Sequence, residues 1–487
     1  MLGSAMAGDD ATPPPPVPAA TTDAPAPAPP AETPAEAPPP LPDNGVDEDA
    51  MFGSPAPTEA PPETGATDLG DVQLTETSSS DIASRLGLAD ERLTIGGKLY
   101  MRAGAAFNED TDLADTPYSS PNLLDLFTDI RPNDRVRGYA QARFRYDFTV
   151  AAGDTDAYGA EAEPASVTLD QLWLKFDVAH RVYVTAGRQR VKWGSGRFWN
   201  PTDFMNQQTL DALNATVFDE RTGVTLMKVH VPIESLGANL YGVANFDGAD
   251  TVEQIGGALR TEWVLGPSEI ALSAAARKGD PLRLGADVSA GVGPFDLHLE
   301  AAVKHGDNGP YYEGTWDIAT FKFPEEVDRS DEWIPQVVAG AELGILVNDE
   351  DTVYVGAEYF YNGAGYESSE LYPYLAFMGY FTPFYLGQHY AGAYIAVPSP
   401  GNWDDISFTT STLSNLSDHT YASRLDVSAK LNTFLSVNAY GQVNYGENGE
   451  LHYSVDIDPV PGVVALEEGI SIPAPIGSVG VGAMVNF

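Results

Sequence analysis

The 487-residue sequence contains no cysteine, has few basic residues and lacks long apolar runs. The absence of cysteine excludes disulfides, zinc–thiolate sites and thiol nucleophiles. With 26 Lys and Arg against 70 Asp and Glu, the formal net charge is -44, which excludes nucleic acid as a partner because two polyanions repel each other. No run of about eighteen apolar residues occurs, so a transmembrane helix is excluded, whereas membrane-spanning β-strands leave a weaker signal and stay open.

The first 90 residues differ in composition from the rest of the chain. Residues 1–62 hold 18 of the 38 prolines, and residues 1–90 hold one basic residue, Arg85, against 16 acidic ones. Such a segment cannot bury enough apolar surface to offset its ordering entropy. We therefore predict that residues 8–90 form a disordered, Pro/Ala-rich acidic tether, with a short helix at 79–88.

The first seven residues end in Ala5-Met6-Ala7. Signal peptidase recognises small residues one and three positions before the cleaved bond, where Ala7 and Ala5 would lie. A random Ala-rich start is the alternative, because neither a charged region nor a long apolar region precedes the pattern. We predict that residues 1–7 are the remnant of a signal peptide.

From about Arg92 onward the hydrophobic pattern has a period of two. In residues 136–150 one face carries small and apolar side chains, and the other carries three arginines among polar residues. Fifteen residues of alternation exceed the usual soluble strand of about five or six and match a tilted strand that crosses a bilayer. The recurring pattern predicts eighteen strands, near 92–104, 122–131, 136–150, 166–178, 181–192, 222–232, 236–247, 255–265, 268–278, 281–292, 295–305, 335–347, 352–362, 388–397, 405–415, 419–430, 433–445 and 476–487.

The lengths of the connections provide an independent check. Alternate connections between the predicted strands are short, and the others include every long loop: 105–121, 151–165, 193–221, 306–334, 363–387 and 446–475. This asymmetry is typical of outer-membrane barrels. A soluble sandwich of so many strands would be unusual, and a solenoid needs a repeat that the chain lacks. Residues 91–487 are therefore predicted to form an all-β, transmembrane, antiparallel up-and-down β-barrel of about eighteen strands.

Six basic side chains are predicted to face the lumen of this barrel. On the lipid side, each would cost roughly 2–4 kcal/mol near the bilayer midplane. Three lie on one face of the strand at 136–150, and three share a face near the end of the strand at 181–192. They are Arg137, Arg143, Arg145, Arg188, Arg190 and Lys192.

Two interpretations of these basic residues stay open. They solvate a polar lumen, or they form a basic wall opposite Asp203, Asp219 and Glu220 that orients solutes and favours anions. Residues 91–487 carry 25 basic and 54 acidic residues, many of them in the long loops. Because that acidic mouth would oppose anion entry, the sign of ion selectivity is left undecided.

The end of the chain has a recognisable pattern. It reads GAMVNF, and Val479, Val481, Ala483, Val485 and Phe487 alternate outward on the last predicted strand. The pattern, with Gly482, Val485 and the terminal Phe487, resembles the C-terminal signal of bacterial outer-membrane β-barrels. The resemblance implies recognition by the barrel-assembly machinery.

Residues 171–205 carry a second resemblance. Gly187-Arg188-Gln189 ends a strand, Trp193-Gly194 follows, and a long loop begins. This segment is similar to outer-membrane porins of the alginate-export type, where the next loop folds inward and narrows the pore. The resemblance implies a constriction at 193–221, which carries Trp193, Arg197, Phe198, Trp199 and Asp203. The aromatic residues either pack this loop against the barrel wall or present flat faces to sugar rings.

The sequence offers little for catalysis or for metal binding. Its seven histidines are scattered, with none at the spacing of a zinc helix. Gly194-Ser195-Gly196 lacks the flanking glycines of a nucleophile elbow. Asp110-Thr111-Asp112 could bind calcium, but a solvated acidic loop is the simpler interpretation. We predict no catalytic residue, no metal site and no cofactor.

The sequence as a whole predicts an outer-membrane porin for passive diffusion of small hydrophilic solutes and ions, with both termini in the periplasm. One alternative is a specific channel for an acidic polysaccharide or oligosaccharide. Another is a structural protein that its Pro-rich tail tethers to the cell wall. The predicted partners are outer-membrane lipid and lipopolysaccharide, the barrel-assembly machinery, and peptidoglycan through the tail. Monomer and homotrimer both stay open, as does a plugging role for the tail.

Overall fold

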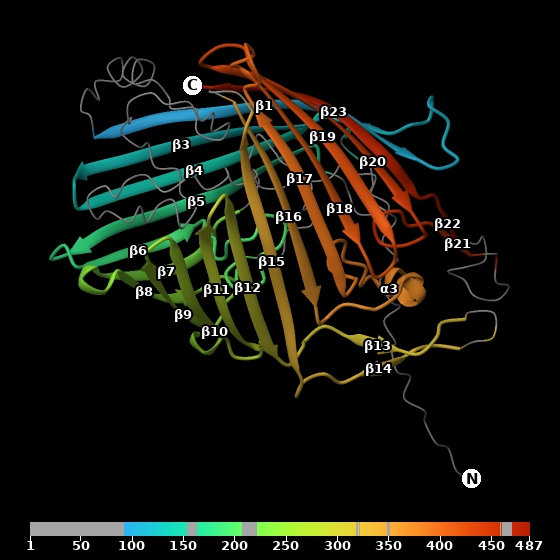
Figure 1. Cartoon of the computed structure of the whole chain (residues 1–487), viewed down its shortest axis with the longest axis horizontal. Coiled ribbons are helices and arrows are strands. Elements are labelled where there is room, and N and C mark those ends of the chain that lie inside the picture. Colours follow the sequence, from blue (N-terminus) through green and yellow to red (C-terminus); the bar gives the residue numbers. More distant parts are fainter. Residues whose placement is uncertain are drawn as a thin grey trace, which may run out of the picture.

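The computed structural model describes residues 92–151, 153, 163–206, 222–317, 320, 322–347, 351–457, 459 and 470–487. Within these residues, eighteen antiparallel strands form one closed barrel, in which each strand pairs with the next along the chain (Figure 1). The first strand, β1 (Leu93–Asn108), also pairs with the last, β23 (Pro475–Asn486), and this pairing closes the barrel. The predicted all-β, up-and-down barrel is therefore confirmed.

The other barrel strands follow in chain order. They are β3 (Pro121–Asn133), β4 (Val136–Asp147), β5 (Ala165–Val178), β6 (Val182–Gln189), β7 (Val224–Ile233), β8 (Ala238–Asn245), β9 (Gly256–Leu265), β10 (Ser268–Ala276), β11 (Leu282–Val292), β12 (Phe295–His305), β15 (Trp333–Leu346), β16 (Thr352–Asn362), β17 (His389–Pro398), β18 (Ile406–Asn415), β19 (Thr420–Lys430) and β20 (Leu435–Gly446). Every strand predicted from the alternation has its counterpart here. The predicted signal-peptide remnant, tether and helix at 79–88 lie outside the described residues.

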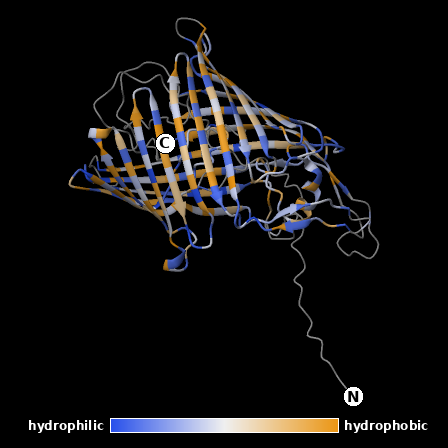
Figure 2. Cartoon of the chain, turned by 60° about the horizontal axis from the view of Figure 1, so that its bottom comes forward, coloured by the Kyte–Doolittle hydropathy of each residue, from blue (hydrophilic) through white to orange (hydrophobic). Residues whose placement is uncertain are grey.

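Alternating side chains give the barrel an apolar outer face and a polar lumenal face. Figure 2 shows hydrophobic and hydrophilic residues alternating along the strands. Leu259 on β9 and Val481 on β23 are each 61% exposed, whereas the neighbouring Arg260 is buried. So many exposed large apolar side chains would be a liability in water, but they suit contact with lipid.

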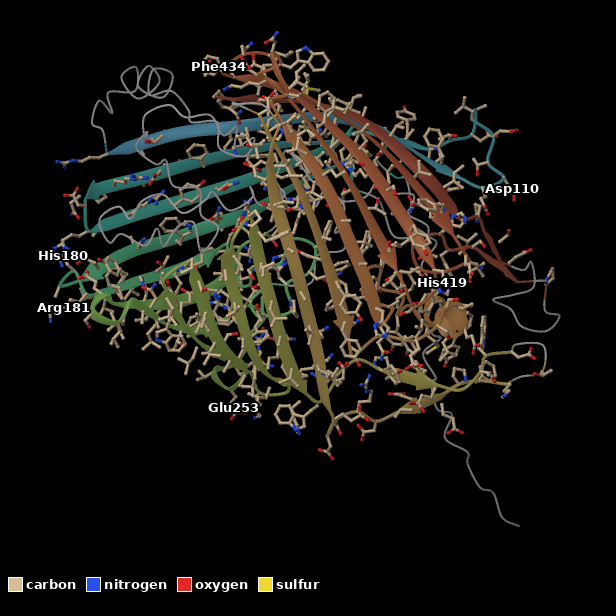
Figure 3. All side chains as sticks on the ribbon, viewed as in Figure 1. Asp110, His180, Arg181, Glu253, His419 and Phe434 are labelled. Carbon is tan, nitrogen blue, oxygen red and sulfur yellow. The ribbon has the colours of Figure 1, made fainter. Side chains whose placement is uncertain are left out.

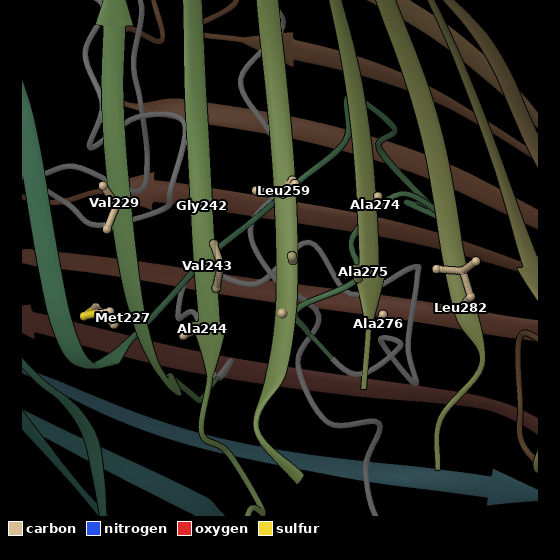
Figure 4. A pocket seen from close by; sticks show the side chains of 12 residues that line it. Met227, Val229, Gly242, Val243, Ala244, Leu259, Ala274, Ala275, Ala276 and Leu282 are labelled. Atoms are coloured by element: carbon tan, nitrogen blue, oxygen red, sulfur yellow. The ribbon is translucent and has the colours of Figure 1, made fainter. Parts of the chain in front are cut away.

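A shallow groove on β7–β11 shows the character of the outer face (Figure 4). Small residues such as Gly242, Ala244 and Gly257 form its floor, and Met227 and Leu282 lie at its margins. None of the residues that line the groove is polar or charged. This composition again fits a surface that faces hydrocarbon.

The two ends of the barrel differ in their connections. At one end, called here the short-turn end, the strands are joined by short turns, and Leu93 and Phe487 lie at this same end. His180, Arg181 and Phe434 mark it in Figure 3, and Asp110, Glu253 and His419 mark the other, the long-loop end. The predicted division into short and long connections is confirmed.

The terminal residue closes the last strand against the first. The backbone N–H of Phe487 donates to the carbonyl of Gly97 at 3.0 Å, and the N–H of Gly97 donates to the carbonyl of Phe487 at 2.8 Å. A Cβ at Gly97 would lie 2.6 Å from the Phe487 ring. Gly482 likewise makes room for the Tyr100 ring on β1, and Val485 pairs in register with Leu99. Recognition of this strand by the assembly machinery stays a prediction.

The long loops contain elements that the alternation did not predict. They include the hairpins β13 (Tyr311–Glu313)–β14 (Glu325–Val327) and β21 (Val455–Ile457)–β22 (Ile470–Ile472), the two-residue strand β2 (Tyr118–Ser119) and the helix α3 (Tyr372–Met378). Tyr312, Tyr372, Tyr374 and Tyr453 belong to one buried cluster that joins the two hairpins and α3, and we call this cluster the loop cap. No helix in the described part of the chain is long and apolar enough to span a membrane.

Replacing an outward leucine with arginine tests which face meets lipid. We expect Leu259→Arg to lower the free energy of unfolding in lipid vesicles by roughly 2–4 kcal/mol more than Leu259→Ala, because it places a charge in hydrocarbon. Urea titration of both variants measures this difference. Equal stability of the two variants would contradict the outward placement of Leu259.

Candidate functional site

The connection between β6 and β7 enters the lumen instead of looping away from the barrel. Strand β6 ends at Gln189, and residues 190–206, called here the folded segment, run inward without regular secondary structure. Trp193 and Trp199 are only 2% and 1% exposed. The rest of the predicted constriction loop, residues 207–221, lies outside the described residues.

The first and last parts of the folded segment pack on the wall formed by β7–β12. Val191, Trp193, Phe204 and Met205 share a buried cluster with apolar residues of these strands, namely Val224, Leu226, Tyr241, Val243, Ala258 and Ala302. Gly285 on β11 provides space, because a Cβ there would lie 2.9 Å from the Phe204 ring. Apolar burial thus holds both ends of the segment to the same wall.

The middle of the segment packs on β15–β19. The Trp199 ring lies 5.4 Å from Phe360 and 5.6 Å from Tyr390, measured between ring centroids. A Cβ at Gly392 would lie 2.5 Å from the Phe198 ring, so only glycine leaves room for this close approach. Of the two roles considered for these aromatic residues, their burial supports packing of the segment over presentation of flat faces to sugars.

Two carboxylates of the wall bind the backbone of the folded segment. Glu300 on β12 accepts hydrogen bonds from the N–H groups of Ser195 at 2.5 Å and Gly196 at 2.6 Å. The Thr202 hydroxyl also donates to Glu300, at 2.8 Å, and the Thr202 N–H at 3.4 Å. An irregular segment leaves amides without partners, and these charge-assisted bonds satisfy them inside the lumen.

Glu358 on β16 does the same for the next turn. It accepts from the backbone N–H of Arg197 and from that of Phe198, the latter at 2.8 Å. His298 Nε2 lies 3.0 Å from Glu358 Oε1, and Gly340 leaves space for the imidazole. Glu300 and Glu358 are 0% and 4% exposed. Sequence reasoning missed both, because each lies about a hundred residues or more from its partners along the chain.

The predicted lumenal arginines are placed beside carboxylates of neighbouring strands. Arg143 donates to Asp125 on β3 at 2.8 Å and lies 3.5 Å from Asp170 on β5, which also binds Arg190. All four side chains are buried. Removing a single member would leave a buried charge without its partner, which costs about 3–5 kcal/mol in proteins.

Arg137 and Arg145 lie on the same strand as Arg143. Arg137 donates to Asp129 at 3.1 Å, and its guanidinium lies 5.3 Å from the Trp173 ring centroid. Arg145 is exposed near the long-loop end of β4. The lumenal face predicted for this strand agrees with its burial pattern, in which Arg143 is buried and Phe144 is 38% exposed.

Arg188 does not share the face of Arg190. It pairs in register with Leu172, which is 52% exposed on the outer face, and its side chain lies 3.5 Å from Asp247. The prediction assumed that the alternation continues as far as Lys192, but β6 ends at Gln189. Beyond that point the backbone turns inward, and this turn brings Arg190 to Asp170. Gly187, with φ of 128°, lies just before the point at which the backbone leaves β6.

The remaining predicted residues lie within the folded segment. The Arg197 guanidinium lies 3.5 Å from the Tyr394 ring centroid, and Tyr394 donates to Glu342. Asp203 accepts from Asn206 at 2.8 Å, and Lys192 is partly exposed. Asp219 and Glu220 lie outside the described residues. Among the described residues, Arg137, Arg143 and Arg190 each pair with an aspartate of a neighbouring strand on the same wall, and not with an acidic residue across the lumen.

A third buried carboxylate, that of Glu450, links the folded segment to the loop cap. The Tyr390 hydroxyl donates to Glu450 at 2.7 Å, while its ring packs on Trp199. Glu450 also accepts from Asn415 at 2.7 Å and from the N–H groups of Tyr385 and Leu386 at 3.0 Å. The segment is thus braced from the long-loop end as well as from the wall.

Glu450 and its neighbour Asp418 are acids with little water around them. Burial raises the pKa of Glu450 to about 7, against hydrogen bonds that lower it, and burial likewise raises the pKa of Asp418. The N–H of Glu450 donates to Asp418 at 2.7 Å, and Asn415 donates to both carboxylates. In the described residues, no group of three or more His, Asp or Glu side chains is arranged to hold a metal ion.

Comparison with known proteins agrees with a channel. Residues 133–289, about a third of the chain, match the model of the family described as phosphate-selective porin O and P. Among curated proteins, none matches the sequence. The family match confirms the predicted resemblance to bacterial outer-membrane porins. It does not test the more specific resemblance to porins of the alginate-export type. The match and the barrel indicate a channel protein of the outer membrane rather than an enzyme.

Several solved structures align with this chain at low sequence identity. OccAB4 of Acinetobacter baumannii is 8% identical with a TM-score of 0.48, over 82% of this chain and 98% of that one. OccK1 (OpdK) of Pseudomonas aeruginosa is 12% identical with a TM-score of 0.45, over 81% and 98%. OprB of Pseudomonas putida is 10% identical with a TM-score of 0.40, over 84% and 97%.

Neutralising Glu300 should loosen the folded segment. We expect Glu300→Gln to speed hydrogen exchange at the Ser195 and Gly196 amides, because hydrogen bonds to a charged group contribute about 1.5–3 kcal/mol and the amide weakens them. Mass spectrometry of the folded barrel in lipid measures this exchange. Glu269→Gln, the same change at another lumenal position, is the control, and identical exchange in both variants would contradict the anchoring role.

The raised pKa of Glu450 predicts a pH dependence of stability. Between pH 4.5, its ordinary pKa, and about 7, the folded chain keeps a proton that the unfolded chain has lost. The free energy of unfolding should therefore fall as pH rises through this window, by at most about 3 kcal/mol from this group. Urea unfolding at pH 5 and 7.5 should show a larger fall in the natural protein than in Glu450→Gln. Equal falls would refute the assignment.

Proposed function

We propose that this protein is an outer-membrane channel through which small hydrophilic solutes and ions diffuse passively, in a lumen narrowed by the folded segment. The observation that supports this most directly is that five backbone amides of the segment bind Glu300 and Glu358. A segment that is bonded and packed against the inner wall reduces the cross-section of the lumen at a defined place. Of the predicted constriction at 193–221, residues 193–206 are described, and they belong to the folded segment.

The description of the matched family names phosphate, but the lumenal arginines do not by themselves support that solute for this chain. A phosphate site needs guanidinium groups that direct donors towards the anion. Arg143 and Arg260 instead donate to Asp125 and Asp287 through paired bonds, and Arg137 donates to Asp129. The proposal therefore concerns small hydrophilic solutes in general.

The two alternative functions stay predictions. A channel for an acidic polysaccharide gains no support from Trp193 and Trp199, whose rings are buried. A structural role that depends on cell-wall attachment concerns the tail, which lies outside the described residues. The experiment below separates both from passive diffusion.

We further propose that the short-turn end faces the periplasm. Leu93 and Phe487 both lie at that end, which suits export through the periplasm followed by assembly from that side. Contacts with lipopolysaccharide, the assembly machinery and peptidoglycan, and the choice between monomer and homotrimer, stay as predicted from the sequence.

Recording single channels of the purified full-length protein in a planar bilayer tests the function. We expect steps of uniform size that persist at low voltage, as in an open pore that the folded segment narrows but does not close. Block of the current by added uronic-acid oligosaccharides would favour the polysaccharide channel. Silence from protein shown to be folded would reject the diffusion channel and favour the structural role.

A further inference from the structure

The barrel wall itself is nearly neutral. By sequence, its eighteen strands contain 14 Lys and Arg against 13 Asp and Glu. Guanidinium groups lie next to carboxylates: Arg260 is 2.6 Å from Glu262 and 2.8 Å from Asp287, and Arg424 is 2.9 Å from Asp426. Charges paired at these distances largely cancel beyond the pair, so the wall exerts little net attraction on an ion of either sign.

The excess of acid is concentrated at the long-loop end. The described residues of the connections at that end include 24 Asp and Glu against 7 Lys and Arg, whereas those at the short-turn end, between residues 134 and 434, include 5 against 2. Neighbouring loops that carry one sign of charge at the mouth of a low-dielectric tube focus their field on the entrance. The entrance at the long-loop end therefore has a negative potential that the wall does not offset.

The hairpin β13–β14 shows how exposed this charge is. Glu313 lies directly opposite Glu325 in the register, and Glu326 follows. All three are exposed, although Tyr312, which pairs with Glu326, is buried in the loop cap. Like charges opposite one another on a hairpin repel, so they add to the local potential without neutralising each other. They also lie outside the folded segment and its anchors, which makes them suitable positions for a test.

From this distribution we infer that the channel prefers cations, both inorganic cations and small organic ammonium solutes, over anions of similar size. The inference rests on the proposed channel function. It adds to that function a preferred class of solute, namely cations, and attributes the preference to the negative charge of the entrance at the long-loop end. Because the wall is balanced, the preference is screened by salt and fades as ionic strength rises.

Reversal potentials under a KCl gradient test the inference on the full-length protein. We expect a potential of the sign set by K⁺, with a several-fold K⁺ over Cl⁻ permeability ratio in dilute salt and a smaller ratio in concentrated salt. The triple substitution Glu313→Gln, Glu325→Gln and Glu326→Gln should lower the ratio. The matched control, Asp134→Asn with Asp404→Asn and Asp405→Asn, removes three exposed charges at the short-turn end and should lower it less.

The possible outcomes separate failure of the cation preference from failure of the proposed channel function. A potential set by Cl⁻, or a K⁺ preference that the triple substitution leaves unchanged, would overturn the inference while the conductance itself upholds the channel. Absence of conductance would overturn the proposed channel function instead. Equal single-channel conductance of the triple variant at saturating salt would show that its barrel is intact.

Discussion

The folded segment depends on a small number of carboxylates that stand in for a missing strand partner. A chain that leaves a sheet and packs against the inner wall of a barrel must satisfy its buried backbone amides without a neighbouring strand. Glu300 and Glu358 do so for five amides between Ser195 and Thr202. Aromatic packing then fixes the segment, and Glu450 braces it through Tyr390. The position of the folded segment therefore follows from acidic side chains on the wall and in one outer loop.

Charge in this protein divides into two parts with different roles. Inside the barrel, arginines and carboxylates alternate on adjacent strands and neutralise each other, as in the pairs of Arg143 with Asp125 and Arg260 with Asp287. A buried charge is tolerated only when it is paired in this way. The surplus of acid lies in the connections at the long-loop end, where most of the described carboxylates apart from Glu450 and Asp418 are exposed and their field extends into the solvent. In the proposed channel and orientation, a solute from outside the cell would meet this entrance before it meets the wall.

The barrel could be predicted from the sequence because lipid imposes a simple rule. Outward positions on a strand are mostly apolar where they meet hydrocarbon, so the alternation shows where each strand lies. The loops carry no such constraint, and the hairpin β13–β14 and the helix α3 went unpredicted. Lumenal contacts were harder still: Glu300 and Glu358 bind residues far away in the sequence, and the partners of Arg143 proved to be neighbours on the wall. Arg188 was assigned to the wrong face because alternation cannot show where a strand ends.

The claim that the folded segment lines the conduit can be measured directly, because the natural chain has no cysteine. Lys192 is partly exposed within the segment, so Lys192→Cys introduces a single reactive thiol there. The account predicts that a bulky thiol-reactive reagent lowers the single-channel conductance of this variant and leaves the cysteine-free protein unaffected. Conductance that stays unchanged after complete labelling, verified by mass spectrometry, would contradict the account.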